Sequence, residues 1–538
     1  MKKHWGFAIL LSLPIFFFYA SHYSNALVDE PLIATGFIQT DQVSYMANAK
    51  EYGERGGFNL QYSLPFSTDY NNEAIYFQPQ LFVLGQIMRI LPIDPGLLLM
   101  LFGFTFTILC IRMCIVIFSE VIHDKPGPFR NIGLLLFIWG GGLICFSSGV
   151  LALFTKNGFE AGLKTLFALE PGAGWWFLNL GRNFVYPMEA YYHFLFFGMV
   201  YFVFKKQYRF FLLLLILLAF SHPFTGTAAL LISTAWVLLE KYYIRRLTLP
   251  TFVLPGLAVL AVTHFSFYFL YLPSNAAHRI LMKQWALDWS MTAERFIPAY
   301  AIVGLLVLLR VSTPKKLLSV FSNPFNRFLA VWAIVNFLLE NHEFAIPAHQ
   351  PLHFTRGYTW SALFLLGYPV VRECSEAFFQ RFSPAVARVL LGFCSLLFLS
   401  DNITWFSHFG RLQSTEIGGI KITPEQKETL DFLATLEVDD RLLVCRDYHI
   451  SYLATVYTGF RPIFAHRFNT VDWRGKIKMQ DDFVQRCVVG DGLRGERVVV
   501  VYDFKNETNC MAEGLEELYR NGRYGVYDVF LYKPIDMQ

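Results

Sequence analysis

Long apolar runs, separated by shorter polar stretches, fill the chain up to about residue 400. A helix that crosses a lipid bilayer needs about 17 to 25 mostly apolar residues. Several runs are shorter than this, so we expect some spans to be thin, tilted or broken. The pattern predicts about eleven membrane-spanning helices, at 5–19, 97–118, 132–154, 190–204, 210–220, 225–239, 252–272, 296–309, 328–339, 354–371 and 386–399.

The charges in the connecting segments predict which side of the membrane each segment faces. Lys and Arg favour the cytoplasmic side in short loops. With the N-terminus inside and the spans alternating, every inside loop is basic, as at Lys205, Lys206 and Arg209, whereas the longer outside loops hold fewer basic residues. We therefore expect an integral, multi-pass membrane protein, which we place in a bacterial inner membrane, with a cytoplasmic N-terminus and an outer C-terminal region.

The composition supports the same class of protein. Of the 538 residues, 54% are apolar, 17% aromatic and only 16% charged, whereas about 25% of the residues of an average soluble protein are charged. The formal net charge of +4 is small and scattered, which argues against nucleic acid as a partner. The eight cysteines show no CxxC spacing, so no zinc site is indicated.

From residue 411 onward the pattern changes to short, alternating elements. We expect helices near 424–436, 451–457, 473–488 and 512–520, and strands near 441–445, 461–465, 497–502 and 524–533. Alternation of this kind is typical of an α/β domain. The sequence therefore predicts an α-helical polytopic membrane domain at 1–410, with a long outer loop at 21–94, and a small outer α/β domain at 411–538.

The first outer loop contains the stretch GFIQTDQVSYMANA, from Gly36 to Ala49. Asp41 and Tyr45 are four residues apart, so they share one face if the stretch is helical. A carboxylate just outside the bilayer, next to a phenol, can take a proton from an acceptor alcohol. The alternative is an acid in the first turn of a helix, followed by a tyrosine at the lipid interface.

Polar residues at the ends of other apolar runs are further candidates for a substrate site. His222 lies between two short runs that meet at Pro223, either at the outer end of a cavity or as the cap of a turn between two helices. The second outer loop, 155–189, contains Glu170 and Arg182. A loop in the aromatic interfacial belt with solvated charges explains these two residues equally well.

The segment at 340–356 gathers three histidines and an arginine at the mouth of a span. His349 and His353 are four residues apart but straddle Pro351. No helical His spacing with a matching acid stands out, so a divalent metal is left open but not indicated. Arg356 is a fixed cation suited to a phosphate group, and its alternative is an arginine that snorkels to the interface.

The stretch Asp41-Gln42-Val43-Ser44-Tyr45 resembles the Asp-Glu-x-x-Tyr motif of the GT-C class of polytopic glycosyltransferases. Aminoarabinose transferases and protein O-mannosyltransferases carry this motif early in their first outer loop. The expected architecture is similar as well, with one span, a long outer loop, about ten further spans and an outer α/β domain. The chain departs from the motif at Gln42, which stands in place of the second acid and leaves one carboxylate.

The resemblance implies transfer of a sugar from a polyprenyl-phosphate donor to a hydroxyl of a saccharide, lipid or protein acceptor at the outer membrane face. In that reaction Asp41 is the general base, and Arg356 or Arg182 stabilises the departing phosphate. Tyr45, His222, His349 and His353 would line the substrate site, with membrane lipid as a partner and no cofactor. The alternatives are a transporter or flippase, or a non-catalytic assembly protein, for lipid-linked saccharides of the envelope. Against a transporter, the sequence shows no internal repeat.

Overall fold

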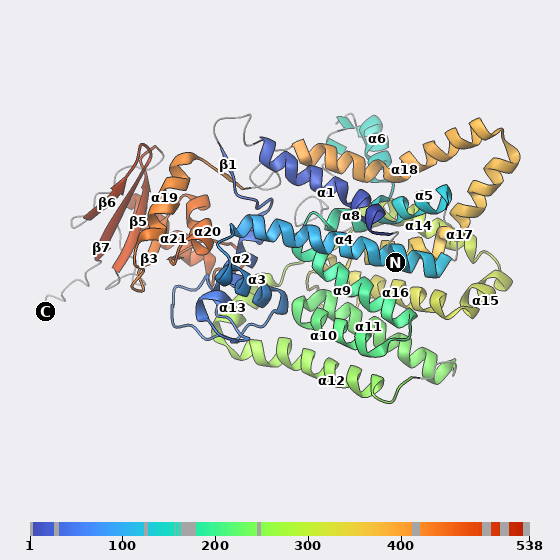
Figure 1. Cartoon of the computed structure of the whole chain (residues 1–538), viewed down its shortest axis with the longest axis horizontal. Coiled ribbons are helices and arrows are strands. Elements are labelled where there is room, and N and C mark those ends of the chain that lie inside the picture. Colours follow the sequence, from blue (N-terminus) through green and yellow to red (C-terminus); the bar gives the residue numbers. More distant parts are fainter. Residues whose placement is uncertain are drawn as a thin grey trace. The chain divides into compact units, whose positions relative to one another are not determined.

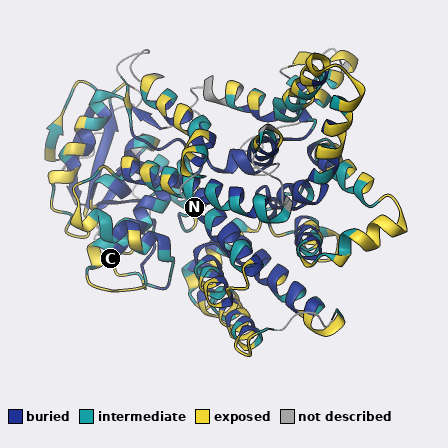
Figure 2. Ribbon diagram, turned by 45° about the vertical axis from the view of Figure 1, so that its right-hand side comes forward, coloured by how far each residue is buried: buried dark blue, intermediate teal, exposed yellow. Residues whose placement is uncertain are grey.

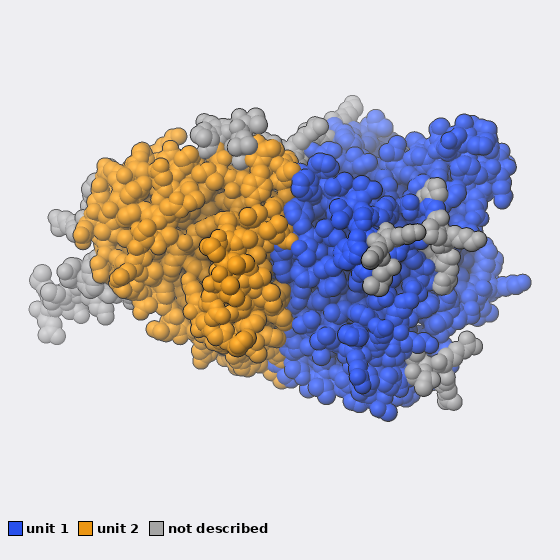
Figure 3. Space-filling model, viewed as in Figure 1, with its two compact units in different colours: residues 1–18, 102–266, 286–411 blue, residues 19–101, 267–285, 412–538 orange. Residues whose placement is uncertain are grey.

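The computed structural model divides into two compact units (Figures 1 and 3). Unit 1 comprises 1–18, 102–266 and 286–411, and unit 2 comprises 19–101, 267–285 and 412–538. Unit 2 thus groups the whole of the first long loop, 21–94, with the C-terminal segment. The structure describes residues 4–25, 32–122, 127–155, 158–159, 161–162, 179–244, 249–411, 420–486, 497–505 and 516–530.

Unit 1 is built of helices. Two long helices, α1 (Trp5–Asn25) and α4 (Pro95–Ile122), contribute residues to both units. The others are α5 (Pro128–Trp139), α6 (Ile144–Thr155), α8 (Leu180–Asn183), α9 (Pro187–Phe204), α10 (Tyr208–Ser221), α11 (Pro223–Leu238), α12 (Val253–Phe265), α14 (Ala293–Arg310), α15 (Pro314–Ser322), α16 (Pro324–Glu340), α17 (Tyr358–Arg381) and α18 (Pro384–Arg411). Short 3-10 turns, η5 (His342–Phe344) and η6 (Pro351–Phe354), connect α16 to α17.

Five of the helices in the described ranges are long and apolar enough to cross a membrane, or up to seven spans if each of two bent pairs counts as one. Exposed residues lie along the helices (Figure 2), and many of them are large and apolar. Val259, Val262 and Leu308, for example, are each 66% exposed, which is unfavourable in water and favourable in lipid. The structure confirms a polytopic helical fold, while the count of eleven spans stays a prediction.

The run at 132–154 is not one helix. It divides into α5 and α6, which are bent by 62° at the three glycines 140–142. A Cβ at Gly142 would lie 2.3 Å from the carbonyl oxygens of Pro298 and Ala299, so only glycine fits there. The carboxylate of Asp401 accepts hydrogen bonds from the backbone N–H groups of Ile144 (3.1 Å) and Cys145 (2.7 Å), which caps the restarted helix.

Unit 2 combines helices from the first loop with a C-terminal α/β fold. Its helices are α2 (Thr40–Arg55), α3 (Pro79–Ile90), α13 (Ala276–Trp285), α19 (Pro424–Thr435), α20 (Tyr448–Tyr457) and α21 (Trp473–Arg486). Helices α2 and α3 pack so closely that a Cβ at Gly85 would lie 2.1 Å from the carbonyl oxygen of Ala49. The structure shows that the stretch with Asp41 and Tyr45 is helical.

A mixed five-stranded sheet forms the C-terminal core, in the order β4-β3-β5-β7-β6. Its strands are β3 (Leu442–Cys445), β4 (Arg461–Pro462), β5 (Arg497–Asp503), β6 (Glu516–Arg520) and β7 (Tyr524–Phe530). Strand β5 pairs parallel with β3 and antiparallel with β7. Helix α19 packs against β7, and α20 packs against β3 and β4 (Figure 1). The structure confirms the expected α/β fold and the buried strand near 497–502.

The helix expected at 512–520 is wrong over the residues that the structure describes. Glu516–Arg520 is strand β6, which pairs antiparallel with β7. Its charged residues form an i,i+3 pair, Glu517 and Arg520, which is also a helical signal. Pairing along the edge of the sheet overrides this weak propensity.

A second, two-stranded sheet connects the first loop to the C-terminal segment within unit 2. Strand β1 (Ile33–Ala34) pairs antiparallel with β2 (Lys421–Ile422). Both β2 residues are buried. The hydroxyl of Thr35 also donates to the carbonyl oxygen of Ile420 at 2.7 Å. These bonds fix the chain a few residues before α2 begins.

A buried histidine makes the stability of unit 2 sensitive to acid. His278 is 4% exposed and lies against Trp285, with its Nδ1 atom 3.1 Å from the hydroxyl of Tyr76. Burial lowers the pKa of His278 to about 4 from 6.5. The neutral ring therefore contributes fully above about pH 6.5, and the contribution is lost as the pH falls towards 4.

We expect His278→Phe, which keeps the packing but does not titrate, to flatten the acid dependence of thermal stability. The melting temperature of the wild type should fall more steeply between pH 6.5 and 4 than that of the variant, measured in the same detergent. Parallel curves for the two proteins would contradict this assignment.

Candidate active site

The start of α2 presents Asp41 at a position suited to reaction. Gln39 caps the helix, because its side-chain oxygen accepts a hydrogen bond from the N–H of Asp41 at 2.8 Å. The Asp41 carboxylate lies in the first turn, where the helix dipole favours a negative charge, and its side chain is 37% exposed. Tyr45, one turn later, is partly exposed. The predicted Asp–Tyr face therefore exists.

Both carboxylate oxygens of Asp41 receive hydrogen bonds. Gln39 donates through Nε2 to Oδ2 at 2.9 Å, and His466 Nε2 lies 3.0 Å from Oδ1. His466 belongs to the C-terminal segment, 425 residues away in the sequence. An ionised carboxylate only accepts hydrogen bonds, so these donors orient it in the form that a general base requires.

The tautomer of His466 follows from its other contact. The backbone N–H of Phe468 donates to Nδ1 at 3.3 Å, so Nδ1 carries no proton. A neutral imidazole then has its proton on Nε2. His466 therefore donates to Asp41 Oδ1.

Tyr452 contacts both His466 and the N-terminal end of α2. Its ring stacks on the imidazole, with centroids 5.4 Å apart and an interplanar angle of 29°. Its hydroxyl donates to the carbonyl oxygen of Thr40 and lies 3.2 Å from Ser44 Oγ. Burial, together with neighbouring Tyr448 and Asp41, raises the pKa of Tyr452 well above its usual range, so the phenol remains a neutral donor.

The residue that replaces the second acid of the motif faces the interior. Gln42 is 1% exposed, and its side-chain oxygen accepts from the N–H of Ile38 at 2.8 Å. The position next to Asp41 in sequence is therefore occupied by a buried hydrogen-bond acceptor that supports the preceding turn. It does not lie beside Asp41 on the partly exposed face, since adjacent helical residues point about 100° apart.

The sequence did not identify the contact with His466. The sequence alone favours an ordinary surface loop at 465–470, between an expected strand and an expected helix, over a segment that faces the site. The structure corrects this interpretation at His466, whose side chain is 6% exposed. The local signal is a histidine just after the strand expected at 461–465, and such a signal does not name a partner.

In unit 1, Arg356 is the centre of a buried polar cluster. Its side chain is 3% exposed and forms an ion pair with Glu189. The guanidinium donates through Nε to the carbonyl oxygen of His353 (2.8 Å) and through Nη2 to His353 Nδ1 (2.8 Å). Nη2 also lies 3.2 Å from His222 Nε2. Arg356 therefore does not snorkel to an interface, and at least three of its five N–H donors are engaged.

The backbone at Arg356 is also constrained. Its φ is +35°, a conformation that costs a non-glycine residue about 1 to 3 kcal/mol. His193 Nε2 donates to the carbonyl oxygen of Arg356 at 2.8 Å and so holds this turn. His222 meanwhile caps α11, with Nδ1 2.9 Å from Thr225 Oγ1. The capped-turn interpretation of His222 is thus observed, and the same ring also contacts Arg356.

Arg182 lies in a second buried cluster of unit 1. It is fully buried, donates to Asn402 Oδ1 at 2.8 Å and stands over the ring of Trp405, 5.7 Å from its centroid. Asp401, the cap of α6, supplies a nearby negative charge. The expectation of a solvated belt charge is wrong for Arg182. Glu170 lies outside the described residues.

His349 is exposed and stacks on Phe224, with centroids 6.1 Å apart. Phe224 also packs on His353, with centroids 4.6 Å apart, so aromatic contact extends from His349 to the Arg356 cluster. His342 Nε2 accepts from the N–H of His349 at 3.0 Å. Within the ranges that the structure describes, no group of three or more His, Cys, Asp or Glu side chains could hold a metal ion.

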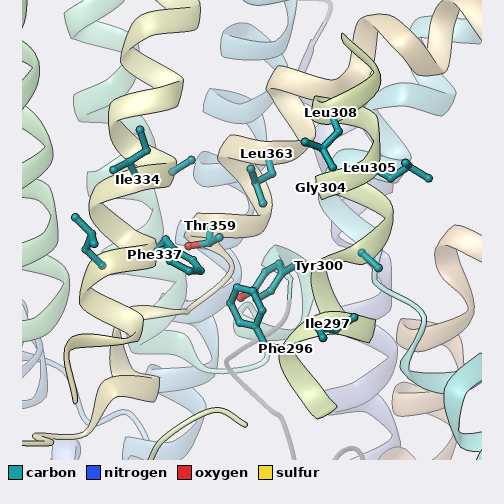
Figure 4. A pocket seen from close by; sticks show the side chains of 13 residues that line it. Phe296, Ile297, Tyr300, Gly304, Leu305, Leu308, Ile334, Phe337, Thr359 and Leu363 are labelled. Atoms are coloured by element: carbon teal, nitrogen blue, oxygen red, sulfur yellow. The ribbon is translucent and has the colours of Figure 1, made fainter. Parts of the chain in front are cut away.

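Unit 1 also carries an apolar groove of about 530 Å³ between α14, α16 and α17 (Figure 4). Its polar atoms are few, and they include the hydroxyls of Tyr300 and Thr359. Thr359 Oγ1 donates to Oε1 of buried Glu340 at 2.5 Å. A groove of this lining suits a hydrocarbon chain.

We expect removal of one partner of the Arg356–Glu189 pair to be strongly destabilising. Glu189→Ala leaves a buried guanidinium without its counter-ion, at a cost of about 3 to 5 kcal/mol. The matched control is Glu120→Ala, which breaks the half-exposed Lys205–Glu120 pair at a cost of at most about 1 kcal/mol. Unfolding of the two purified variants in detergent measures this difference, and equal losses would show that Glu189 does not neutralise Arg356.

No protein-family model and no curated protein sequence matches this chain. Among solved structures, it is similar to ArnT from Cupriavidus metallidurans in the apo state, with a TM-score of 0.48 and 11% identity over 97% of this chain and 98% of that chain. It is also similar to the oligosaccharyltransferase of Archaeoglobus fulgidus in the apo form, with a TM-score of 0.44 and 12% identity over 93% of this chain and 70% of that chain. Both are glycosyltransferases of the GT-C class that the Asp41 motif resembles. Likeness at this level does not assign an activity, so function follows from this chain's own residues.

Proposed function

We propose that this protein is a membrane glycosyltransferase that moves a sugar from a polyprenyl-phosphate donor to an acceptor hydroxyl, with Asp41 as the general base. The observation that carries the proposal is the Asp41 carboxylate itself. It is partly exposed at a helix N-terminus, and side chains from two distant parts of the chain orient it. A carboxylate that only stabilised the helix would not need a buried imidazole as a partner.

The reaction requires one proton transfer and one displacement. The acceptor hydroxyl gives its proton to the Asp41 carboxylate while its oxygen forms a bond to the anomeric carbon of the sugar. The bond from that carbon to the phosphate oxygen breaks, and its electron pair leaves with the polyprenyl phosphate. General-base assistance of this kind contributes about 10²- to 10⁴-fold to the rate.

The donor would use features of unit 1. The apolar groove between α14 and α16 suits a polyprenyl tail, since its lining is almost wholly hydrocarbon. The leaving phosphate needs a cation, and we assign this role to Arg356 or Arg182. Both are buried with polar partners, so a phosphate would have to take the place of one of them, such as Glu189. Aromatic contact places His349 and His353 near Arg356 as further substrate-binding candidates.

The orientation of the protein is part of the proposal. Basic inside loops favour a cytoplasmic N-terminus, which puts the Asp41 loop and the α/β fold on the outer face of a bacterial inner membrane. Tyr45, one turn after Asp41, would then contact the acceptor. The acceptor is a saccharide, lipid or protein hydroxyl at that surface.

We expect Asp41→Asn to lower sugar transfer by about 10²- to 10⁴-fold without loss of folding, because an amide keeps the shape but cannot take the proton. The measurement is transfer from a polyprenyl-phosphate sugar by purified protein in detergent. The matched control is Glu54→Gln, which removes an exposed carboxylate from the other end of α2 and should leave transfer unchanged. Full activity of Asp41→Asn would remove Asp41 from the role of base.

We expect Arg356→Ala to weaken binding of polyprenyl phosphate more than Arg356→Lys does, because lysine retains the positive charge. The test is titration of each variant with the phosphorylated lipid, compared at equal folded fraction. Equal losses of affinity in the two variants would argue against contact between Arg356 and the phosphate and would leave it as a purely structural ion-pair partner.

A further inference from the structure

We propose that His466 is the positioning residue for Asp41, so that the C-terminal α/β fold contributes directly to the reaction centre. This inference rests on the proposed function of Asp41. The contact lies within unit 2 and joins a residue of the first loop to one that follows strand β4. It is therefore a specific long-range bond and not a consequence of neighbouring positions in the sequence.

His466 is held in one orientation by its surroundings. The ring stacks on Tyr452 and lies near Phe66, whose ring centroid is 6.3 Å away. The backbone N–H groups of Ala465 and His466 point to Thr470 Oγ1, at 3.5 and 3.3 Å. A side chain locked in this way can hold a catalytic group within the tolerance that a reaction requires.

Helix α13 anchors the segment that follows His466. Trp285 donates through Nε1 to the carbonyl oxygen of Phe468 at 2.6 Å, and Gln284 donates through Nε2 to the carbonyl oxygen of Thr470 at 3.1 Å. The bond to its carbonyl oxygen anchors Phe468, the residue whose N–H donates to the Nδ1 atom of His466. The tautomer that donates to Asp41 is thus built into the fold.

The role that fits this geometry is orientation by a neutral donor. With His466 on Oδ1 and Gln39 on Oδ2, rotation of the Asp41 carboxylate would cost one of the two hydrogen bonds. The remaining accepting directions of the oxygens are then fixed relative to the exposed side, where an acceptor hydroxyl approaches. Loss of the imidazole N–H would leave the charge of the Asp41 carboxylate unchanged but would no longer fix its orientation. Small misplacements of a reacting group lower the rate by large factors.

The test compares His466→Phe with His466→Gln. Phenylalanine keeps the aromatic packing on Tyr452 but has no donor, whereas the side-chain N–H of glutamine can replace Nε2–H. We expect His466→Phe to lower kcat about 10- to 100-fold with KM changed less than twofold, and His466→Gln to recover most of the loss. The matched control is His449→Gln on α20, which should leave kcat unchanged. Equal losses of kcat in the Phe and Gln variants would overturn the proposal.

A double-variant cycle separates positioning from a general structural effect. If His466 acts through Asp41, His466→Phe should cause no further loss of kcat when Asp41 is already Asn. Additive losses of kcat would overturn the proposal.

The same cycle on melting temperature tests the contact without any assay of transfer. Non-additive changes for Asp41→Ala and His466→Phe would show that the pair exists. If the changes in melting temperature are non-additive but the wild-type protein transfers no sugar, the proposed function is disproved and the contact remains. Additive melting temperatures would disprove the contact itself.

Discussion

The hydrogen bond between Asp41 and His466 joins the first loop to the C-terminal α/β fold within unit 2. A partly exposed carboxylate in the first turn of a helix is common and by itself indicates little. Here, however, the buried imidazole of His466, with a fixed tautomer, donates to one carboxylate oxygen of Asp41, and Gln39, which caps the helix, donates to the other. The α/β fold is needed to bring that imidazole to the helix, because strand β4, helix α20 and the anchor from α13 each hold part of its surroundings.

In unit 1, charged side chains are buried among apolar helices. Two buried arginines have polar partners close by: Arg356 has Glu189 and His353, and Arg327 has Glu240, with N–O distances of 2.5 and 2.8 Å. An unpaired charge in such surroundings would cost several kcal/mol. Polar partners of this kind explain how Arg182 and Arg356, for which the sequence also allows an interfacial position, are buried in the structure.

Local periodicity predicted much of the fold. The helix after Asp41, the two helices that meet at Pro223 and the buried strand β5 follow from patterns contained within about fifteen residues. The errors come where distant residues decide. Strand β6 forms because it pairs with β7, and Asp401 caps α6 after the break between α5 and α6. The proposed site shows the same limit, because the sequence points to Asp41 as a candidate but does not assign it His466 as a partner.

The replacement of the motif's second acid by Gln42 becomes intelligible in this setting. Gln42 is buried and accepts from the backbone of Ile38. A carboxylate there would bury a negative charge near the one on Asp41, and like charges so placed disfavour ionisation of both groups. A neutral amide accepts the same backbone hydrogen bond without that penalty. The single-acid version of the motif is therefore consistent with the proposed role of Asp41 as a base that must stay ionised, in which the neutral donor of His466 orients the carboxylate.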